Sequence, residues 1–421
     1  MVVELERLVR ERRSIRKFTS DSIPPEDLNE ILRLAAQPAH KRLVESYRVL
    51  PVSDRETIEQ MRTACTETIE KKAAQWTPED EASWAQLGIP FPKRDQIGSS
   101  LRDHYRYFSR RFDTFFNEAP VVLALAAVPV RWGPAPHVWP TLQLVGAVMQ
   151  TIQLAAWEKG IGSCCMTGPL HSREELGRIL DLEPPWQIVA LLPLGYPRRV
   201  PPARPRKPLS EVLRWIGDSE SRGPSETSGQ DRASVPSFSA VVERRRNVYE
   251  FGSSPVSPAE IEEIVDAARL APNSLNQQKW RFLGITDRDV LKKIGDSMVK
   301  RASEIEAVGE ELAIVDPPDT GMALGEPHAW RAFISERADC LAAAPAAIAV
   351  SNEAVPLGLT SGGWSDIESI GCAVETLMLS IAARGRNSCW MTSPLIAWQE
   401  VDRLLGVEDP WRTVALVPVG A

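Results

Sequence analysis

Apolar positions recur with a helical period along several stretches of this chain, and continuous apolar runs lie between them. Glu4 to Arg13 predicts a charged amphipathic helix. Gln143 to Lys159 predicts a more apolar helix that ends at Gly160, a residue suited to a helix C-cap. Pro24-Pro25, followed by acid in the first turn, indicates the start of another helix. Trp186 to Leu194 is an apolar run of strand length.

The same order of elements occurs twice: helix, helix, strand, a long variable middle, strand, helix, strand, helix, strand. Strands that alternate with helices in two layers indicate an α+β sandwich. In the first half, Gly160 to Pro169 reads as a buried strand. There Cys164 and Cys165 would pack as small hydrophobic side chains.

The two halves also repeat each other residue by residue. Arg12-Arg13-Ser14 near the start returns as Arg245-Arg246-Asn247, a shift of 233, and Gly160 to Gly195 returns as Gly385 to Gly420, a shift of 225. Two registers held over such lengths indicate duplication of a whole domain, which excludes a solenoid of short units.

The boundary between the copies lies in a segment that cannot form regular structure. Residues 201–208 contain four prolines, and residues 217–235 are rich in Ser, Gly, Asp and Glu. We therefore expect a first domain at 1–216, a linker at 217–235 and a second domain at 236–421.

The composition and charge of the chain limit the classes of function that we expect for it. The chain has 421 residues, 43% hydrophobic and 25% charged, which is typical of a globular protein with two or three domains. A net charge of −7 gives no electrostatic footprint for nucleic acid or anionic membrane. The sequence shows no signal-peptide pattern and no apolar run of membrane-spanning length, so we expect a cytoplasmic protein. The six cysteines and five histidines show no metal-ligand spacing.

The two copies follow one pattern of four motifs, each of which is intact in one copy: Arg-Arg-Ser-x-Arg-x-Phe, Ala-Pro-x-Ser-x-Asn-x-Gln, Gly-x-Gly-Ser-Cys and Gly-Tyr-Pro with a basic tail. Together they resemble the FMN-dependent nitroreductase superfamily. The resemblance implies α+β architecture, with two nitroreductase-like α/β sandwich domains packed as an intrachain pseudo-dimer. It also implies FMN as cofactor, NAD(P)H as electron donor and a small-molecule substrate.

The basic residues have a chemical role that does not depend on the resemblance. Arginine binds a phosphate dianion through charge-assisted, bidentate hydrogen bonds, and a serine hydroxyl can add another. The candidates for the FMN phosphate are Arg12, Arg13, Ser14, Arg16, Arg204 and Arg206. The alternative for the first cluster is a solvated basic helix end.

Each copy retains a different part of the site that the resemblance implies. The first copy retains the phosphate cluster and Thr167-Gly168, whose backbone amides the resemblance places near the flavin N5. The second retains the loop that would face the flavin: Pro272, Asn273, Ser274 and Asn276. The first copy has lost this loop, with Ala39, His40, Lys41, Leu43 and Glu45 in its place, and the second has Asn247, Tyr249 and Ser393 where the first has Ser14, Arg16 and Gly168.

All retained elements belong to one composite site, so we expect one FMN in a monomeric pseudo-dimer. The rival interpretation is independent drift of two domains that each dimerise with another chain. The implied activity is two-electron transfer between NAD(P)H and a small organic acceptor. A flavin-sequestering protein with little turnover, or a non-flavin interaction protein, is the alternative.

The acceptor is less defined. Aromatic side chains crowd a basic segment at 102–116, which would suit a planar, electron-poor or anionic substrate. The alternative is that they form the core of an amphipathic helix.

Overall fold

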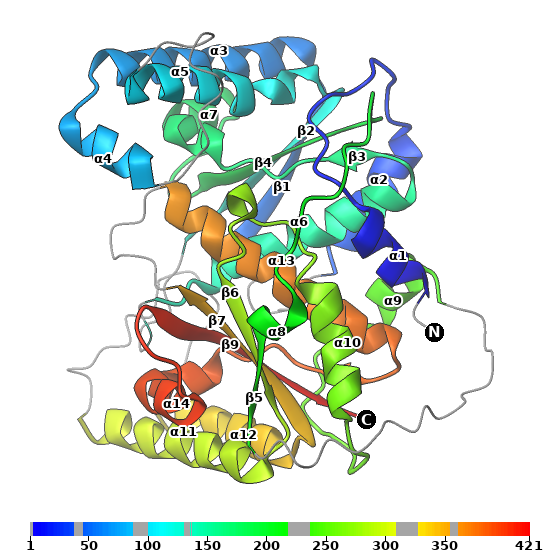
Figure 1. The fold of residues 1–421 in the computed structure, drawn as a ribbon, viewed down its shortest axis with the longest axis vertical. Coiled ribbons are helices and arrows are strands. Elements are labelled where there is room, and N and C mark those ends of the chain that lie inside the picture. The colour runs from blue at the N-terminus through cyan, green and yellow to red at the C-terminus, as the bar shows by residue number, and fades with distance from the viewer. Residues whose placement is uncertain are drawn as a thin grey trace.

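The computed structural model describes residues 3–37, 45–86, 100–129, 135, 137–217, 236–308, 327–353 and 361–421. It contains two α+β units, each with a mainly antiparallel sheet covered by helices, as the sequence predicts (Figure 1). Residues 218–235 of the expected linker lie outside the described part. None of the described helices is long and apolar enough to cross a bilayer.

The first copy begins with two helices and a strand, and its long middle forms three more helices. Its elements are α1 (Val3–Glu11), α2 (Pro25–Ala35), β1 (Tyr47–Val52), α3 (Arg55–Ala74), α4 (Pro78–Gln86), α5 (Leu101–Phe112), β2 (Val121–Ala127), α6 (Pro140–Glu158), β3 (Gly162–Ser163), α7 (Arg173–Ile179) and β4 (Gln187–Gly195), with 3-10 turns at Phe115–Glu118 and Gly168–Ser172. The predicted helices and the strand at 186–194 are present within a few residues. Gly160 takes the expected left-handed conformation, with φ of 73°.

The second copy repeats this order with two helices in its middle. Its elements are α9 (Phe238–Arg244), α10 (Pro258–Ala268), β6 (Trp280–Ile285), α11 (Arg288–Val308), α12 (Pro327–Ala343), β7 (Ala346–Glu353), α13 (Ser361–Ala383), β8 (Asn387–Ser388), α14 (Trp398–Leu405) and β9 (Trp411–Gly420), with 3-10 turns at Ser274–Asn276 and Ser393–Ala397.

The tail of the first copy crosses to the second. The first sheet has the order β1-β2-β4-β3, and the second has the order β5-β6-β7-β9-β8. After α8 (Leu209–Val212), strand β5 (Leu213–Ile216) pairs in parallel with β6, whereas the other strand pairs are antiparallel. Residues 196–216 therefore run from one sheet to the edge of the other, which carries the basic tail across the boundary between the copies.

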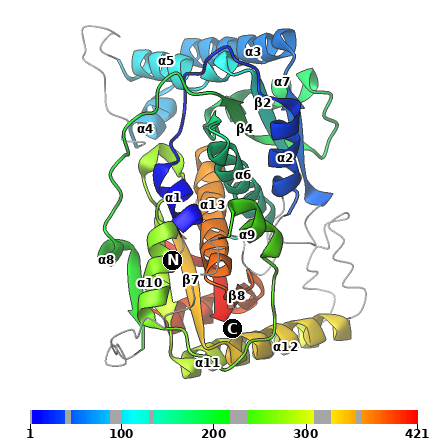
Figure 2. The same cartoon turned by 90° about the vertical axis from the view of Figure 1, so that its right-hand side faces the viewer.

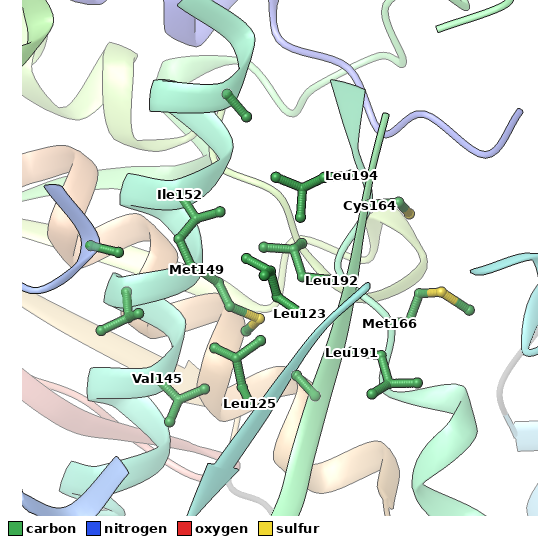
Figure 3. Packing of buried hydrophobic residues seen from close by; sticks show 14 of the residues in the cluster. Leu123, Leu125, Val145, Met149, Ile152, Cys164, Met166, Leu191, Leu192 and Leu194 are labelled. Carbon is green, nitrogen blue, oxygen red and sulfur yellow. The ribbon is translucent and has the colours of Figure 1, made fainter. Parts of the chain in front are cut away.

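The strand expected at 160–169 is much shorter in the structure. Only Gly162–Ser163 pair with β4, and the chain then leaves the sheet, returning in a single bridge between Met166 and Leu191. Cys164 is buried in the core, in agreement with its predicted packing role, whereas Cys165 is only partly buried. Figure 3 shows Cys164 and Met166 beside Leu191 and Leu194 of β4.

Helices α6 and α13 form the centre of the molecule and pack directly on each other (Figure 2). The contact is closest at Gly146 and Gly371, which are equivalent positions of the two copies. A Cβ at Gly146 would overlap the backbone oxygen of Glu368, and one at Gly371 would overlap that of Gln143. The two copies are therefore related by a pseudo-two-fold arrangement in which glycine allows backbone contact.

Candidate functional site

A cavity of about 730 Å³ lies between the two copies. All twelve residues predicted from the sequence line it: Arg12, Arg13, Ser14, Arg16, Thr167, Gly168, Arg204, Arg206, Pro272, Asn273, Ser274 and Asn276. They come from four segments that are far apart along the chain, and the structure brings these segments together. The volume is within the range of roughly 300–1,000 Å³ that is usual for small-molecule and cofactor sites.

The N-terminal cluster is held in place by the short strand β3. The amide of Ile15 donates to the Ser163 carbonyl oxygen at 2.8 Å, which fixes the chain directly after α1. Arg12 is buried, and its Nη1 donates to Gln153 Oε1 at 3.3 Å. Burial lowers the pKa of Arg12 to about 10. A buried cation with one long hydrogen bond is well placed to accept an anionic ligand.

Arg13 and Arg16 present further donors to the cavity. Nη1 of Arg13 donates to the carbonyl oxygens of Arg10 and Arg12 at 2.6 and 2.9 Å, while its Nε is buried and has no partner among the described residues. The guanidinium of Arg16 lies 6.0 Å from the ring centroids of both Phe112 and Phe115. The cationic end of the cavity thus continues into an aromatic wall.

The basic tail is bound to the loop of the second copy. Arg206 donates to the carbonyl oxygens of Leu270 and Ala271 at 3.1 and 3.0 Å, and also to Asn276 Oδ1. Burial, together with the nearby Arg12 and Arg204, lowers the pKa of Arg206 to about 10. Because three acceptors hold its guanidinium, Arg206 stays at the cavity edge against the repulsion of its neighbours.

The loop between α10 and β6 has an unusual backbone. Leu275, Asn276 and Gln278 have φ of 49°, 64° and 52°, in the left-handed region that non-glycine residues seldom adopt. Asn273 Oδ1 accepts from the Gln278 amide at 2.8 Å, and the Ser274 amide donates to Ser369 Oγ at 3.1 Å. Strained backbone held by such contacts is typical of functional sites.

Asn276 belongs to the loop that was expected to face the flavin, and it lines the cavity. In the structure, its Nδ2 donates to the Pro205 carbonyl oxygen at 3.0 Å, and its Oδ1 accepts from Arg206. Asn276 therefore ties the tail of one copy to the loop of the other.

Helix α13 supplies a wall of the cavity that the sequence reasoning missed. Ser365, Glu368, Ser369 and Cys372 line it at helical spacing. Glu368 is 1% exposed, and neither carboxylate oxygen has a hydrogen-bond partner among the described residues. Burial raises the pKa of Glu368 well above its usual range. The signal in the sequence was the row of polar residues on one face of an otherwise apolar helix.

The aromatic side chains of the segment at 102–116 have both of the roles considered for them: some form core and others line the cavity. Tyr105 packs against Trp76 and Trp84 with ring centroids about 5 Å apart, as core. Phe108, Phe112 and Phe115 line the cavity instead. Three of the side chains are thus available to contact a ligand.

Asp113 adds an acid to this wall. Burial raises its pKa to about 7. Its carboxylate lies so close to Gly168 that a Cβ there would overlap Oδ1. A side chain at position 168 would therefore require Asp113 to move, and the second copy has the buried Ser393 at the equivalent position.

The pseudo-symmetric cleft differs at several of its positions. Cys165, which lines the cavity, is replaced by Trp390, a much larger and buried side chain. Asn247 Oδ1 accepts from the Trp390 amide at 3.4 Å, and Tyr249 lies beneath the guanidinium of Arg337 at 3.5 Å. His40 and Lys41 of the altered loop lie outside the described residues. Trp390 and Ser393 are thus both larger than the residues at the equivalent positions of the first copy.

The fold is that of a duplicated α+β protein, and the cavity between its copies is lined by both cationic and aromatic side chains. The family described as the Nitroreductase family matches residues 9–196 and 242–421. Both copies are matched, and together they make up most of the chain. The chain belongs to the Nitroreductase family.

The chain spans about 30% of the length of several curated relatives that it matches. An oxygen-insensitive NADPH nitroreductase from Helicobacter pylori is 41% identical over 66 residues, which are 14% of this chain and 29% of that enzyme. A 4-nitrobenzoate reductase from Pseudomonas putida is 29% identical over 205 residues, 44% of this chain and 84% of that enzyme. The structure of a BluB-like flavoprotein from Clostridium difficile 630 is 20% identical with a TM-score of 0.41, covering 50% of this chain and 97% of that one.

Proposed function

We propose that this protein is an FMN-dependent oxidoreductase that transfers two electrons from NAD(P)H to a small organic acceptor at one site between its two copies. The observation that carries the proposal is the cavity of about 730 Å³ in which the arginines of the first copy meet the Pro-Asn-Ser-Leu-Asn loop of the second. The similarity to an NADPH nitroreductase and to a 4-nitrobenzoate reductase supports this reaction class.

The residues of the cavity fit FMN in their chemistry. Arg12, Arg13 and Arg16, with Arg204 and Arg206 opposite, would hold the phosphate dianion, and the partnerless Nε of Arg13 is a donor that an anion would satisfy. Phe108, Phe112 and Cys165 offer apolar surface for a flat ring. Thr167 and Gly168 would present backbone amides to the ring, as the family resemblance suggests.

Bound FMN would supply the hydride chemistry, and the protein would supply binding, orientation and exclusion of water. The described residues contain no cluster of His, Cys, Asp or Glu able to hold a metal ion. Asp113 is the acid nearest to Gly168, and its raised pKa would leave much of it protonated near neutral pH. A carboxylic acid in that state can deliver a proton to the acceptor as electrons arrive.

A single site in each chain is supported by two replacements in the second copy. Trp390 occupies the position of the cavity-lining Cys165, and Ser393 that of Gly168. Replacement of small residues by larger ones reduces the room for a second flavin.

The test is a visible spectrum of the purified protein, with released flavin counted per chain and the mass in solution measured alongside. One FMN per monomeric chain is expected. Two FMN per chain would overturn the single site, and a dimer that binds flavin only between chains would favour independent drift. No flavin after incubation with excess FMN would overturn the flavin assignment altogether.

Turnover separates an oxidoreductase from a flavin-sequestering protein. The holo-protein should oxidise NADPH or NADH when a nitroaromatic acceptor is present. Flavin bound at one per chain, with no oxidation of either nucleotide over a panel of acceptors, would favour sequestration.

A further inference from the structure

Two ion pairs join the copies at the surface. Arg10 in the last turn of α1 contacts Asp266 in α10 at 2.6 Å, and Arg33 in α2 contacts Glu243 in α9 at 2.6 Å. Helix α1 packs on α10 and α2 packs on α9, so each pair spans the boundary between the copies (Figure 2).

The two ion pairs occupy equivalent positions with their charges exchanged. At the shift of 233, Arg10 corresponds to Glu243, and Arg33 corresponds to Asp266. The pseudo-two-fold contact is therefore made twice. At both positions the first copy supplies the cation and the second copy supplies the anion.

This pattern matters for which copies can pair. If two first copies met through the same surface, Arg10 of one would face Arg33 of the other. Two second copies would likewise place Glu243 against Asp266. Both homotypic arrangements bring like charges together, whereas the arrangement in the chain brings opposite charges together.

We propose that these four residues direct each copy to pair with the unlike copy and disfavour association of two chains through like copies. Association of two like copies competes with the correct pairing because the two copies contribute equivalent residues to the interface, including Gly146 and Gly371. During synthesis or refolding, a folded first copy could therefore meet another first copy before its own second copy is complete. Repulsion built against a wrong partner is a common source of specificity.

A third ion pair between the copies is a useful contrast. Arg384 donates to Glu6 at 2.8 Å. The position equivalent to Arg384 is Lys159, so two first copies would still place a cation against Glu6. Charge exchange is thus specific to the Arg10–Asp266 and Arg33–Glu243 contacts.

The size of the expected effect on association depends on how exposed the ion pairs are. Arg10 and Asp266 are 54% and 23% exposed, and Arg33 and Glu243 are 51% and 47% exposed. Each pair alone therefore contributes little free energy. When two chains exchange into homotypic pairs, however, four contacts change from attraction to repulsion. Together they predict that homotypic association is disfavoured by at least about tenfold at low salt.

The experiment exchanges the charges within one pair. In Arg33→Glu/Glu243→Arg, the intrachain ion pair is kept, but like copies now also present opposite charges. Arg10→Asp/Asp266→Arg is the second such variant, and the quadruple variant that combines both exchanges restores the original discrimination with reversed signs. All four proteins are unfolded, refolded over a range of concentrations at low salt, and separated by size with mass detection.

We expect about a tenfold rise in dimers and larger species for each double variant, and a return to wild-type behaviour for the quadruple variant. In about 1 M salt, wild type should approach the double variants, because salt screens exposed charges. Equal association of all four proteins at low salt would overturn the proposal, as would a quadruple variant that associates like the doubles. Circular dichroism and thermal unfolding identify any variant that fails to fold, and the two independent doubles keep the test valid.

Discussion

Arg13 and Arg246 are a matched pair that tests the single-site hypothesis directly. They are equivalent residues, and their local contacts are the same: Nη1 of Arg13 donates to the Arg10 and Arg12 carbonyl oxygens, and Nη1 of Arg246 donates to those of Glu243 and Arg245. Only Arg13 lines the cavity. Replacing either by alanine therefore removes the same internal hydrogen bonds.

The expected difference comes from the ligand. A charge-assisted hydrogen bond to phosphate contributes about 1.5–3 kcal/mol, so Arg13→Ala should weaken FMN binding roughly 10- to 150-fold. Arg246→Ala should leave the dissociation constant within about twofold of wild type, since surface changes away from a site have small effects. The assay is titration of apo-protein into FMN, followed by quenching of flavin fluorescence.

Stability measurements separate binding from folding. Urea unfolding should give similar midpoints for the two alanine variants, because their lost contacts are alike. Equal loss of FMN affinity in both variants would refute the single-site hypothesis. An unchanged affinity in Arg13→Ala would refute the assignment of this arginine to the phosphate. Arg245→Ala is a poorer control, because Arg245 is buried near Glu375 and its loss would leave that carboxylate uncompensated.

Three further predictions concern the framework of the site. Gly371→Ala would place a Cβ on the backbone oxygen of Gln143 and should lower the free energy of unfolding, measured in urea, by about 2 kcal/mol. Gly177→Ala is the control, because its Cβ would meet nothing nearer than 4.0 Å. It should raise the free energy of unfolding by up to about 1 kcal/mol. Because the pKa of Glu368 is raised in the folded state, its contribution to stability is full below the unfolded pKa and is lost as pH rises toward the folded pKa. The melting temperature of Glu368→Gln should therefore exceed that of wild type by a margin that grows between about pH 4 and 8. A margin that does not change with pH would contradict the burial of a neutral acid. Arg206→Lys keeps the positive charge but removes the forked guanidinium that reaches three acceptors. Hydrogen exchange of the backbone amides at residues 271–278 should therefore become about tenfold faster or more. Unchanged exchange rates would show that the tail does not hold the loop.

Much of the site could be predicted from the sequence because its chemistry lies in short local motifs. Arg12 to Arg16 follow one helix, and Pro272 to Asn276 follow another, so each group is recognisable without knowledge of the fold. That the two groups share one cavity was predicted from the way the copies had diverged. The duplication itself gave the order of elements in both halves.

The remaining features depend on contacts distant in sequence. Glu368 lies within an apolar helix, and only the packing of α13 against α6 turns its face toward the cavity. Leu213–Ile216 is a short apolar stretch, and nothing local indicates that it joins the sheet of the other copy. The hydrogen bonds of Asn276 with Arg206 and Pro205 join residues 70 and 71 positions apart, and no local pattern in the sequence indicates them.

Duplication within one chain explains why these differences can coexist. In a symmetric homodimer, one substitution enters both interfacial sites at once, so a change that fills one site fills the other. Here Trp390 stands at the position equivalent to Cys165, and Ser393 stands where Gly168 makes room for Asp113. The exchanged charges of Arg10–Asp266 and Arg33–Glu243 need the same freedom, because the two subunits of a homodimer carry the same residue at each position. These unlike charges join the two copies within one chain, in the arrangement that brings the arginines of the first copy and the loop of the second to the same cavity.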